Sequence, residues 1–457
     1  MLASAAVERA DLIVTGDVYT VDAARSWAKA IAIRGDRIVA VGTEADVRDR
    51  VGTAEVLSGA CVMPGFQDAH IHAAFAGRIR RHCNLDDLHS VPDYLDRIAA
   101  HAAAHPDDAW IVGGGWYTPL FGDDGPHRHQ LDAVVPDRPV YLMNTDTHAA
   151  WVNTKALDDA GELTARVVTS LWWDRHRGME QVDELVEQRD WGTKGQVDAG
   201  TIKIMLDGCP ESATGSMLAP YEGHFGEEHG LGIQFVEEGA LREAVTRLDE
   251  LGFQIHQHAL GDRAFRSALD AVEAARAANG WNDTRHHIAH LQLPDPSDTP
   301  RLRPLGVAAN IQPLWACPDP MIETLTRPRV GDRAERLYPI GDVVRSGAVL
   351  ALGSDWPIST PNVFEEMQVA VTRQVIGDGP DAPVLDASQR ITLAEALAGF
   401  TRGSAYVNHD DQAGTIAEGM RADLAILDRN PFAGSVYEIA DTKVTATVAA
   451  GRVVYGG

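Results

Sequence analysis

Short apolar runs recur through the middle of the chain, and segments with helical spacing separate them. Residues 239–251 place apolar side chains at helical intervals and lead into an apolar run that ends at His258. A second helical pattern, at residues 263–278, follows that run. Thr392 and Glu395 have the spacing of a capping box and predict the start of a further helix. This alternation predicts parallel βα units.

Eight of the apolar runs have the character of buried strands, and eight strands are enough to close a (β/α)8 barrel. They lie near residues 62–68, 140–144, 166–171, 201–206, 253–258, 287–290, 307–312 and 349–353. The chain has 457 residues, and a barrel with one small accessory domain accommodates that length.

Both ends of the chain show short strands and tight turns instead. The two-residue link Gly35-Asp36 between alternating apolar runs predicts a hairpin. The predicted terminal strands are residues 12–15, 18–21, 30–34, 37–41, 422–427, 444–449 and 452–455. We therefore expect a discontinuous β domain, residues 1–64 and 405–457, and a barrel domain at residues 65–404.

The charge of the chain narrows the range of partners. There are 40 Lys and Arg residues against 66 Asp and Glu residues, which gives a formal net charge of −26. This charge repels phosphate backbones and anionic lipid surfaces. We expect a small-molecule substrate and neither nucleic acid nor a membrane as partner. The sequence leaves the oligomeric state open, and a homo-oligomer is one alternative.

Cysteine usage and the N-terminus indicate a cytoplasmic protein. The four cysteines are scattered without a C-x-x-C pair, so neither a disulfide framework nor a thiolate zinc site is indicated. The first residues carry charge too early for a signal peptide. The sequence also lacks a Gly-x-Ser-x-Gly elbow, a P-loop and a Gly-x-Gly-x-x-Gly fingerprint, which argues against serine hydrolases, NTPases and dinucleotide-binding enzymes.

Four apolar runs end in residues that can bind a metal ion. His70 and His72 follow the first run, and residues two apart on a strand point to the same face, so both imidazoles can reach one ion. His258, His290 and Asp355 close three later runs. Histidine nitrogen and carboxylate oxygen are ligands that zinc and similar divalent ions prefer.

Lys203 lies inside an otherwise apolar run, where an unpaired ammonium is costly to bury. On residue chemistry alone, the favoured interpretation is a side chain that reaches solvent from an edge strand or pairs with Asp207. His256 competes with His258 as a ligand, because both lie on the same face of one predicted strand.

In their order along the chain, these motifs resemble the amidohydrolase superfamily, and most closely amidohydrolase family 3, which includes N-substituted formamide deformylases. The resemblance is carried by Pro64-Gly-Phe-x-Asp-x-His-x-His72, Lys203 with Asp-Gly four residues later, His258-Ala-x-Gly-Asp, His290 and Gly353-Ser-Asp-Trp-Pro357. It covers nearly the whole chain. The fold that it implies is α/β, a (β/α)8 TIM-type barrel with a small β-sandwich domain built from both termini.

The resemblance also implies a centre of two divalent metal ions, with zinc as the default. His70, His72 and Asp355 would bind one ion, and His258 and His290 the other. Lys203, N-carboxylated by carbon dioxide, would bridge them. A metal-bridging hydroxide would cleave a non-peptide C–N bond of an amide, and Asp355 would pass its proton to the leaving amine. The family pattern favours His258 over His256.

Substrate contacts are expected from segments that resemble the pocket of this family. Trp116 and His148 are the candidates there, and further tryptophans could add an aromatic wall, although buried tryptophans are more often core. The leading substrate is an N-substituted formamide or a related amide. The alternatives are a cyclic amide, a carbamate or an aminoheterocycle at the same site, or a non-catalytic binding or regulatory relative.

The chain departs from the family pattern after Gly161. Relatives carry a long segment there, whereas Glu162-Leu-Thr164 joins the flanking parts almost directly. Either residues 140–144 take the vacant barrel position or the barrel is incomplete. All six predicted ligands lie outside this gap.

Overall fold

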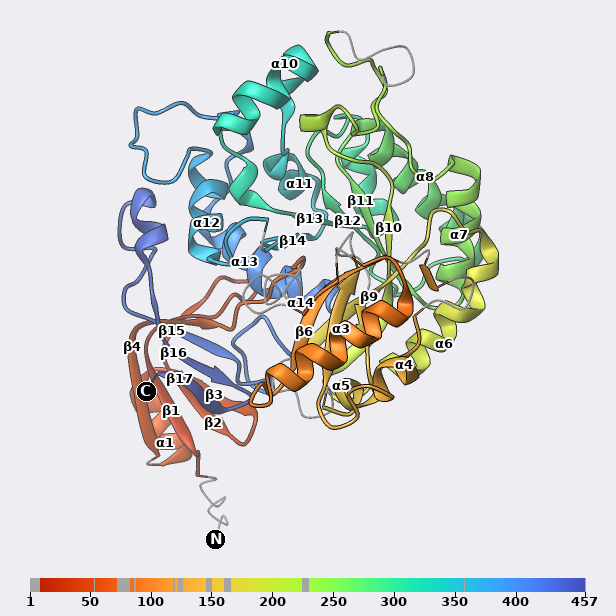
Figure 1. The fold of residues 1–457 in the computed structure, drawn as a ribbon. Helices are drawn as coiled ribbons and strands as arrows, with labels where there is room; N and C mark the ends of the chain where they lie inside the picture. The colour runs from red at the N-terminus through yellow and green to blue at the C-terminus, as the bar shows by residue number, and fades with distance from the viewer. Residues whose placement is uncertain are drawn as a thin grey trace. The chain divides into compact units, whose positions relative to one another are not determined.

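The fold is described from a computed structural model of the chain (Figure 1). The structure describes residues 9–52, 54–71, 83–85, 88–117, 120–121, 126–144, 150–159, 166–223, 230–356 and 358–456. The chain divides into two compact units. Unit 1 is Met1–Ile71, Leu206–Arg242 and Gln257–Gly457, and unit 2 is His72–Met205 and Glu243–His256.

Strands from both ends of the chain pair in one seven-stranded sheet of unit 1, in the order β17-β16-β15-β4-β1-β2-β3 (Figure 1). The strands are β1 Leu12–Tyr19, β2 Trp27–Arg34, β3 Arg37–Gly42, β4 Glu55–Pro64, β15 Leu424–Leu427, β16 Val444–Ala449 and β17 Arg452–Gly456. Only the β1–β4 pair among these neighbours is parallel. The predicted strands of the two termini thus share one sheet, while a β-sandwich stays a prediction.

Local sequence explains how this sheet is built. Successive β1 residues face opposite sides, so Leu12 and Val14 join one buried cluster and Ile13 joins another, which includes Val47 of α1 (Glu44–Val51). The predicted hairpin at Gly35-Asp36 is confirmed, and Gly35 has the positive φ of +57° that the turn needs. Instead of the two predicted strands at residues 12–15 and 18–21, residues 12–19 form the single strand β1, with a register shift after Thr15.

Unit 1 also contains three parallel neighbours, β12 (His287–His290), β13 (Ala308–Ile311) and β14 (Leu350–Leu352). Its helices include α8 Asp262–Asn279, α9 Leu302–Leu305, α10 Arg327–Val330, α11 Ile340–Ser346, α12 Val363–Thr372, α13 Leu393–Ala398 and α14 Ser404–Val407. The capping box at Thr392 is confirmed, because Thr392 and Glu395 exchange side-chain and backbone hydrogen bonds at the start of α13. Helix α7 (Glu238–Glu250) and strand β11 (Gln254–Ala259) each cross the boundary between the units.

Unit 2 is built around a four-stranded sheet in the order β5-β6-β7-β8 and a parallel pair, β9 with β10. The strands are β5 Cys83–Asn84, β6 Ile111–Trp116, β7 Val140–Asn144, β8 Ala150–Val152, β9 Val167–Trp172 and β10 Val197–Met205. The helices are α3 Val91–Ala104, α4 Arg128–Asp132, α5 Thr154–Asp159 and α6 Val182–Gly192. Tyr94 and Ile98 of α3 pack with Trp116 and Trp151 in its core.

Seven of the eight runs predicted as barrel strands are strands with boundaries close to those expected, namely β7 and β9–β14. The eighth prediction is wrong, because β4 ends at Pro64 and pairs with β1 and β15 in the terminal sheet. Proline has no N–H to donate to a further ladder bond. Closure of a barrel stays a prediction, and the short link after Gly161 lies outside the described residues. None of the described helices is both long and apolar enough to cross a membrane.

Candidate metal centre

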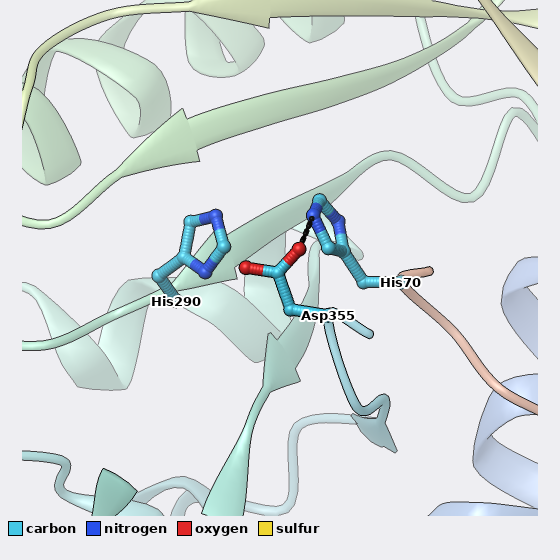
Figure 2. A group of neighbouring side chains, drawn as sticks. All are labelled: His70, His290 and Asp355. Carbon is cyan, nitrogen blue, oxygen red and sulfur yellow. Dashed lines mark ion pairs between the residues drawn. The ribbon is translucent and has the colours of Figure 1, made fainter. Parts of the chain in front are cut away.

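Two histidines and an aspartate converge inside unit 1 (Figure 2). The ligand atoms of His70, His290 and Asp355 all lie within 4.8 Å of one another, and all three residues are buried. His70 Nε2 and Asp355 Oδ1 are 3.1 Å apart. A tetrahedral ion with bonds of about 2.0 Å holds its ligand atoms about 3.3 Å apart. The donor set therefore fits a divalent metal ion, and the distance between His70 Nε2 and Asp355 Oδ1 matches the spacing of two ligand atoms on one ion.

Hydrogen bonds connect the segment that contains His70 to the residues after β14. Asp68 accepts hydrogen bonds from the backbone N–H groups of His70, at 3.0 Å, and of Ser354, at 2.9 Å. The backbone N–H of Asp355 donates to the carbonyl oxygen of His70 at 2.6 Å. A Cβ atom at Gly353 would lie only 2.4 Å from the backbone nitrogen of His70. The close approach of these two backbone segments therefore requires glycine at position 353. Hydrogen bonds rather than a strand thus hold His70.

The interpretation of His70 as the end of a strand is accordingly wrong, because β4 stops six residues earlier, at Pro64. The argument from strand periodicity for pairing His70 with His72 fails with it. His72 lies outside the described residues.

His290 and Asp355 come from the carboxyl ends of parallel strands. His290 is the last residue of β12, and Asp355 follows β14 by three residues. Their φ angles are +80° and +53°, in a region that side-chain-bearing residues seldom adopt. Such strain persists only where the surroundings impose it, and it is common at functional sites.

His258, on β11, lies beside this cluster. Its ring centroid is 4.7 Å from that of His290, and its Nδ1 is 3.2 Å from Asp207 Oδ1. Burial raises the pKa of Asp207 to about 7, against the opposing effect of three backbone N–H donors, from Ser216, Leu260 and Gly261. A carboxylate on the far nitrogen of a histidine fixes the ring orientation, as is common beside metal sites.

Lys203 and His256 form a buried pair in unit 2. Lys203 Nζ lies 3.2 Å from His256 Nε2, and both residues are 6 % exposed. Unit 1 thus brings together His70, His258, His290 and Asp355, and unit 2 holds Lys203 and the competing residue His256.

Of the two predicted substrate contacts, Trp116 is among the described residues. Trp116 is 1 % exposed, its indole N–H donates to the carbonyl oxygen of Leu142 at 2.7 Å, and it packs against Phe121 and Trp151. The Trp116 side chain is thus part of the unit 2 core, and its role at a pocket stays a prediction. His148 lies outside the described residues.

The sequence analysis did not identify the polar residues that support the candidate ligands. Asp68 was named only as part of a motif, and Gln312, whose Oε1 lies 2.8 Å from His290 Nδ1, was not considered. A signal was present, because Asn310 and Gln312 interrupt a run that is otherwise buried and apolar.

Similarity to known proteins agrees with this geometry. The chain is 26% identical to N-substituted formamide deformylase from Arthrobacter pascens, over 97% of this chain and 98% of that protein. Its fold resembles that of an uncharacterized metal-dependent hydrolase from Pyrococcus horikoshii, with a TM-score of 0.64, 21% identity and coverage of 93% and 99% of the two chains. A variant of the atrazine chlorohydrolase TrzN from Arthrobacter aurescens, complexed with zinc and atraton, gives a TM-score of 0.56 at 16% identity, over 97% and 95% of the chains.

The fold is one that metal-dependent hydrolases share, and the histidine–carboxylate cluster is a donor set that could hold a metal ion. The model of the amidohydrolase family matches residues 57–169 and 159–455, which is most of the chain. The chain therefore belongs to the amidohydrolase family, as the order of its motifs predicted, and is a hydrolytic enzyme that acts on C–N bonds.

Proposed function

We propose that the protein hydrolyses a non-peptide amide bond with the help of two divalent metal ions, with zinc as the leading choice. The observation that carries the proposal is the convergence of His70, His290 and Asp355 inside unit 1. When bound, such ions make hydroxide available at neutral pH and polarise the scissile carbonyl.

The ligands are assigned to the ions as the family resemblance suggests. His70, His72 and Asp355 would hold one ion, and His258 and His290 the other. The contact of the His258 and His290 rings supports the second assignment. N-carboxylation of Lys203 would supply an anionic bridge. The sequence motif supports this role, and burial of the side chain adds to it, because a buried ammonium is costly.

Asp355 is the proposed proton-transfer residue. Its carboxylate would accept a proton from the attacking water and deliver it to the nitrogen of the leaving amine. The side chain is buried, and its contact with His70 Nε2 holds one oxygen in place. A carboxylate shielded from bulk water keeps the proton close to the reacting atoms.

The proposed substrate is an N-substituted formamide or a related amide with an apolar or aromatic substituent. The Trp315 ring stacks on His290, with centroids 5.9 Å apart and planes inclined by 29°, and so offers an aromatic surface beside a ligand. The likeness to a formamide deformylase supports the same class. A panel of N-alkyl and N-benzyl formamides, tested beside acetamides, cyclic amides and carbamates, examines this choice. A preference for cyclic amides or carbamates would contradict it.

Lys203→Ala tests the bridging role. We expect this variant to lose metal and activity, and small carboxylic acids such as acetate to restore part of both, because an added carboxylate can replace the missing anion. Lys443→Ala, which changes an exposed lysine, is the matched control. Unchanged metal content and rate in Lys203→Ala would remove lysine as the bridge.

A further inference from the structure

A chain of buried amide side chains links His290 to the segment before His70. Gln312 Oε1 lies 2.8 Å from His290 Nδ1, and Gln312 Nε2 donates to Asn310 Oδ1 at 3.1 Å. Asn310 Nδ2 then donates to the carbonyl oxygen of Ala69 at 2.7 Å. Both amide residues are 0% exposed, so water does not compete for these bonds.

The backbone carbonyl at the end of this chain sets the direction of every bond in it. A carbonyl oxygen can only accept, so Asn310 must present its NH2 group to Ala69. The Asn310 oxygen is then left to accept from Gln312, which turns the Gln312 oxygen toward His290. The reverse orientation would bring the Asn310 oxygen against the Ala69 oxygen, with no proton between them.

The direction of these hydrogen bonds determines the tautomer of His290. An amide oxygen has no proton to give, so His290 Nδ1 must carry the hydrogen of their shared bond. In a neutral imidazole the other nitrogen, Nε2, then has the free electron pair that binds a metal.

We propose that Asn310 and Gln312 are positioning residues that hold His290 as the Nδ1–H tautomer and reserve its Nε2 for a metal ion. This inference rests on the proposed function, since it assigns a role to residues around the same centre. Asn310 lies on β13, and Gln312, two positions after Asn310, directly follows that strand, so both side chains leave on one face.

The same series of hydrogen bonds also connects two proposed metal ligands, His70 and His290, that lie far apart in the sequence. Ala69 directly precedes His70, and its N–H donates to the carbonyl oxygen of Leu352 at 3.2 Å. A bond from Asn310 to Ala69 therefore fixes the backbone that carries one ligand, while Gln312 fixes the ring of another. Loss of either amide is expected to loosen both ligands.

Ring-nitrogen NMR of metal-free protein, labelled with 15N-histidine, tests the tautomer directly. The His290 signals are assigned by their loss in His290→Gln. We expect the protonated nitrogen of His290 to be Nδ1 in the wild type, and a mixture with the Nε2–H form in Gln312→Leu and Asn310→Leu. A wild-type His290 protonated at Nε2, or a tautomer that neither variant changes, would overturn the proposal. The wild-type spectrum decides the matter even where a variant fails to fold.

Zinc affinity, measured by competition with a chromophoric chelator, gives a second readout. We expect Gln312→Leu to weaken zinc binding by about 10- to 100-fold, the usual effect of removing a partner behind a metal ligand. Gln389→Leu is the matched control, because Gln389 is also a buried amide but hydrogen-bonds with Asp342. Equal affinity in Gln312→Leu and the control would overturn the proposal.

A double variant tests whether Asn310 and Gln312 act through the same series of hydrogen bonds. The combined Asn310→Leu and Gln312→Leu changes should weaken zinc binding little more than the worse single change. Fully additive losses would contradict a shared chain. None of these readouts needs turnover, so an inactive protein with the expected tautomer would count against the proposed function and leave this inference standing.

Discussion

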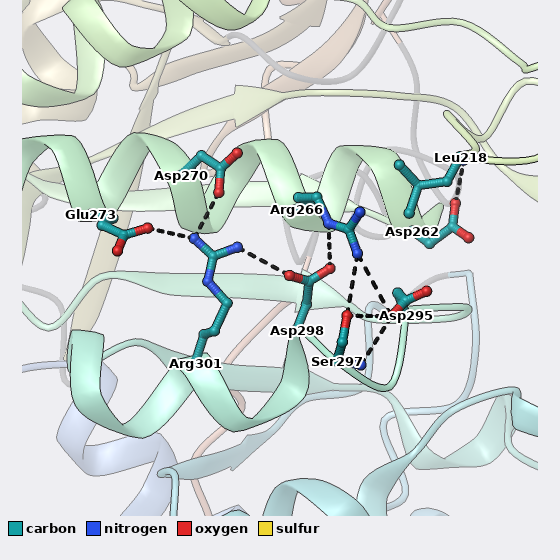
Figure 3. Close-up of polar contacts among 9 residues, drawn as sticks. All are labelled: Leu218, Asp262, Arg266, Asp270, Glu273, Asp295, Ser297, Asp298 and Arg301. Carbon is teal, nitrogen blue, oxygen red and sulfur yellow. Dashed lines mark hydrogen bonds and ion pairs between the residues drawn. The ribbon is translucent and has the colours of Figure 1, made fainter.

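Two of the buried aspartates of unit 1, Asp298 and Asp355, are stabilised in different ways. Asp298 lies between two guanidinium groups, with Arg266 Nε 2.8 Å from Oδ2 and Arg301 Nη1 3.0 Å from Oδ1 (Figure 3). Asp355 faces the imidazole of His70 at 3.1 Å (Figure 2). Arginine remains protonated, whereas histidine is neutral or charged according to its surroundings.

The partners of the two aspartates explain their different uses. Arg301 also contacts Asp270 and Glu273, so Asp298 belongs to a network that is satisfied within the protein (Figure 3). Burial alone would lower the pKa of Arg301, but its carboxylate partners raise it further above the usual range. Asp355 has a positive φ and histidine partners that suit a metal ion. The surroundings of Asp298 therefore favour stability of the fold, and those of Asp355 favour binding of a metal ion.

The largest expected effect comes from Asp355→Asn. An amide cannot take up the proton, so turnover should fall by about 10²- to 10⁴-fold, far more than substrate affinity changes. Steady-state kinetics at matched zinc content measures both. Asp298→Asn is the control that should leave turnover nearly unchanged. Normal turnover in Asp355→Asn would refute its role in proton transfer.

Asp298→Ala should lower the stability of the fold, whereas Asp355→Asn should lower turnover. It leaves Arg266 and Arg301 without their shared carboxylate, and we expect a loss of about 2–3 kcal/mol in the free energy of unfolding. This is below the effect at a fully buried pair because both arginines are partly exposed. Denaturant unfolding of metal-free protein measures the change.

Asp270→Ala provides the comparison for that measurement. Asp270 contacts the same Arg301 but is 39% exposed, so its loss should cost less than about 1 kcal/mol. Equal effects of the Asp270 and Asp298 changes would contradict the expectation that the buried Asp298 contributes more to stability than the more exposed Asp270 does.

Glu366 is another buried carboxylate, and it differs from Asp298 and Asp355 because it accepts hydrogen bonds from neutral groups. Glu366 accepts hydrogen bonds from the backbone N–H of Leu314 at 2.6 Å and from Ser359 Oγ at 3.1 Å. Burial raises the pKa of Glu366 well above its usual value. The folded protein thus binds this proton more tightly than the unfolded chain does, and stability falls as the pH rises from the unfolded pKa toward the folded one.

Glu366→Gln should remove this pH-dependent cost with a modest gain in stability. The variant is expected to gain more over the wild type at about pH 8 than at about pH 5, in thermal unfolding of metal-free protein. Glu365→Gln, on the same helix and less buried, is the control. An equal difference between variant and wild type at both pH values would contradict the account.

Sequence patterns predicted strands well where apolar runs are bounded by turns. The limits of β7 and β12 were predicted to the residue. Strand β6 was missed because Gly113-Gly114-Gly115 is typical of a loop, whereas the sheet needs these glycines. A Cβ at Gly113 would lie 2.1 Å from the carbonyl oxygen of Cys83.

The site was predictable to a different extent. Residue chemistry identified His290 and Asp355, because each closes an apolar run that becomes the end of a parallel strand. The support from Asp68 and Gln312 could not be predicted, since it depends on which polar side chains meet across segments far apart in sequence. Local patterns contain no information on such pairings until the strands are placed.

The metal content per chain of protein purified without chelators, determined by elemental mass spectrometry, tests the central claim most directly. About two equivalents of zinc or a similar divalent ion would agree with the proposed centre. Protein that is folded but binds little or no metal, or that saturates at one equivalent, would contradict it.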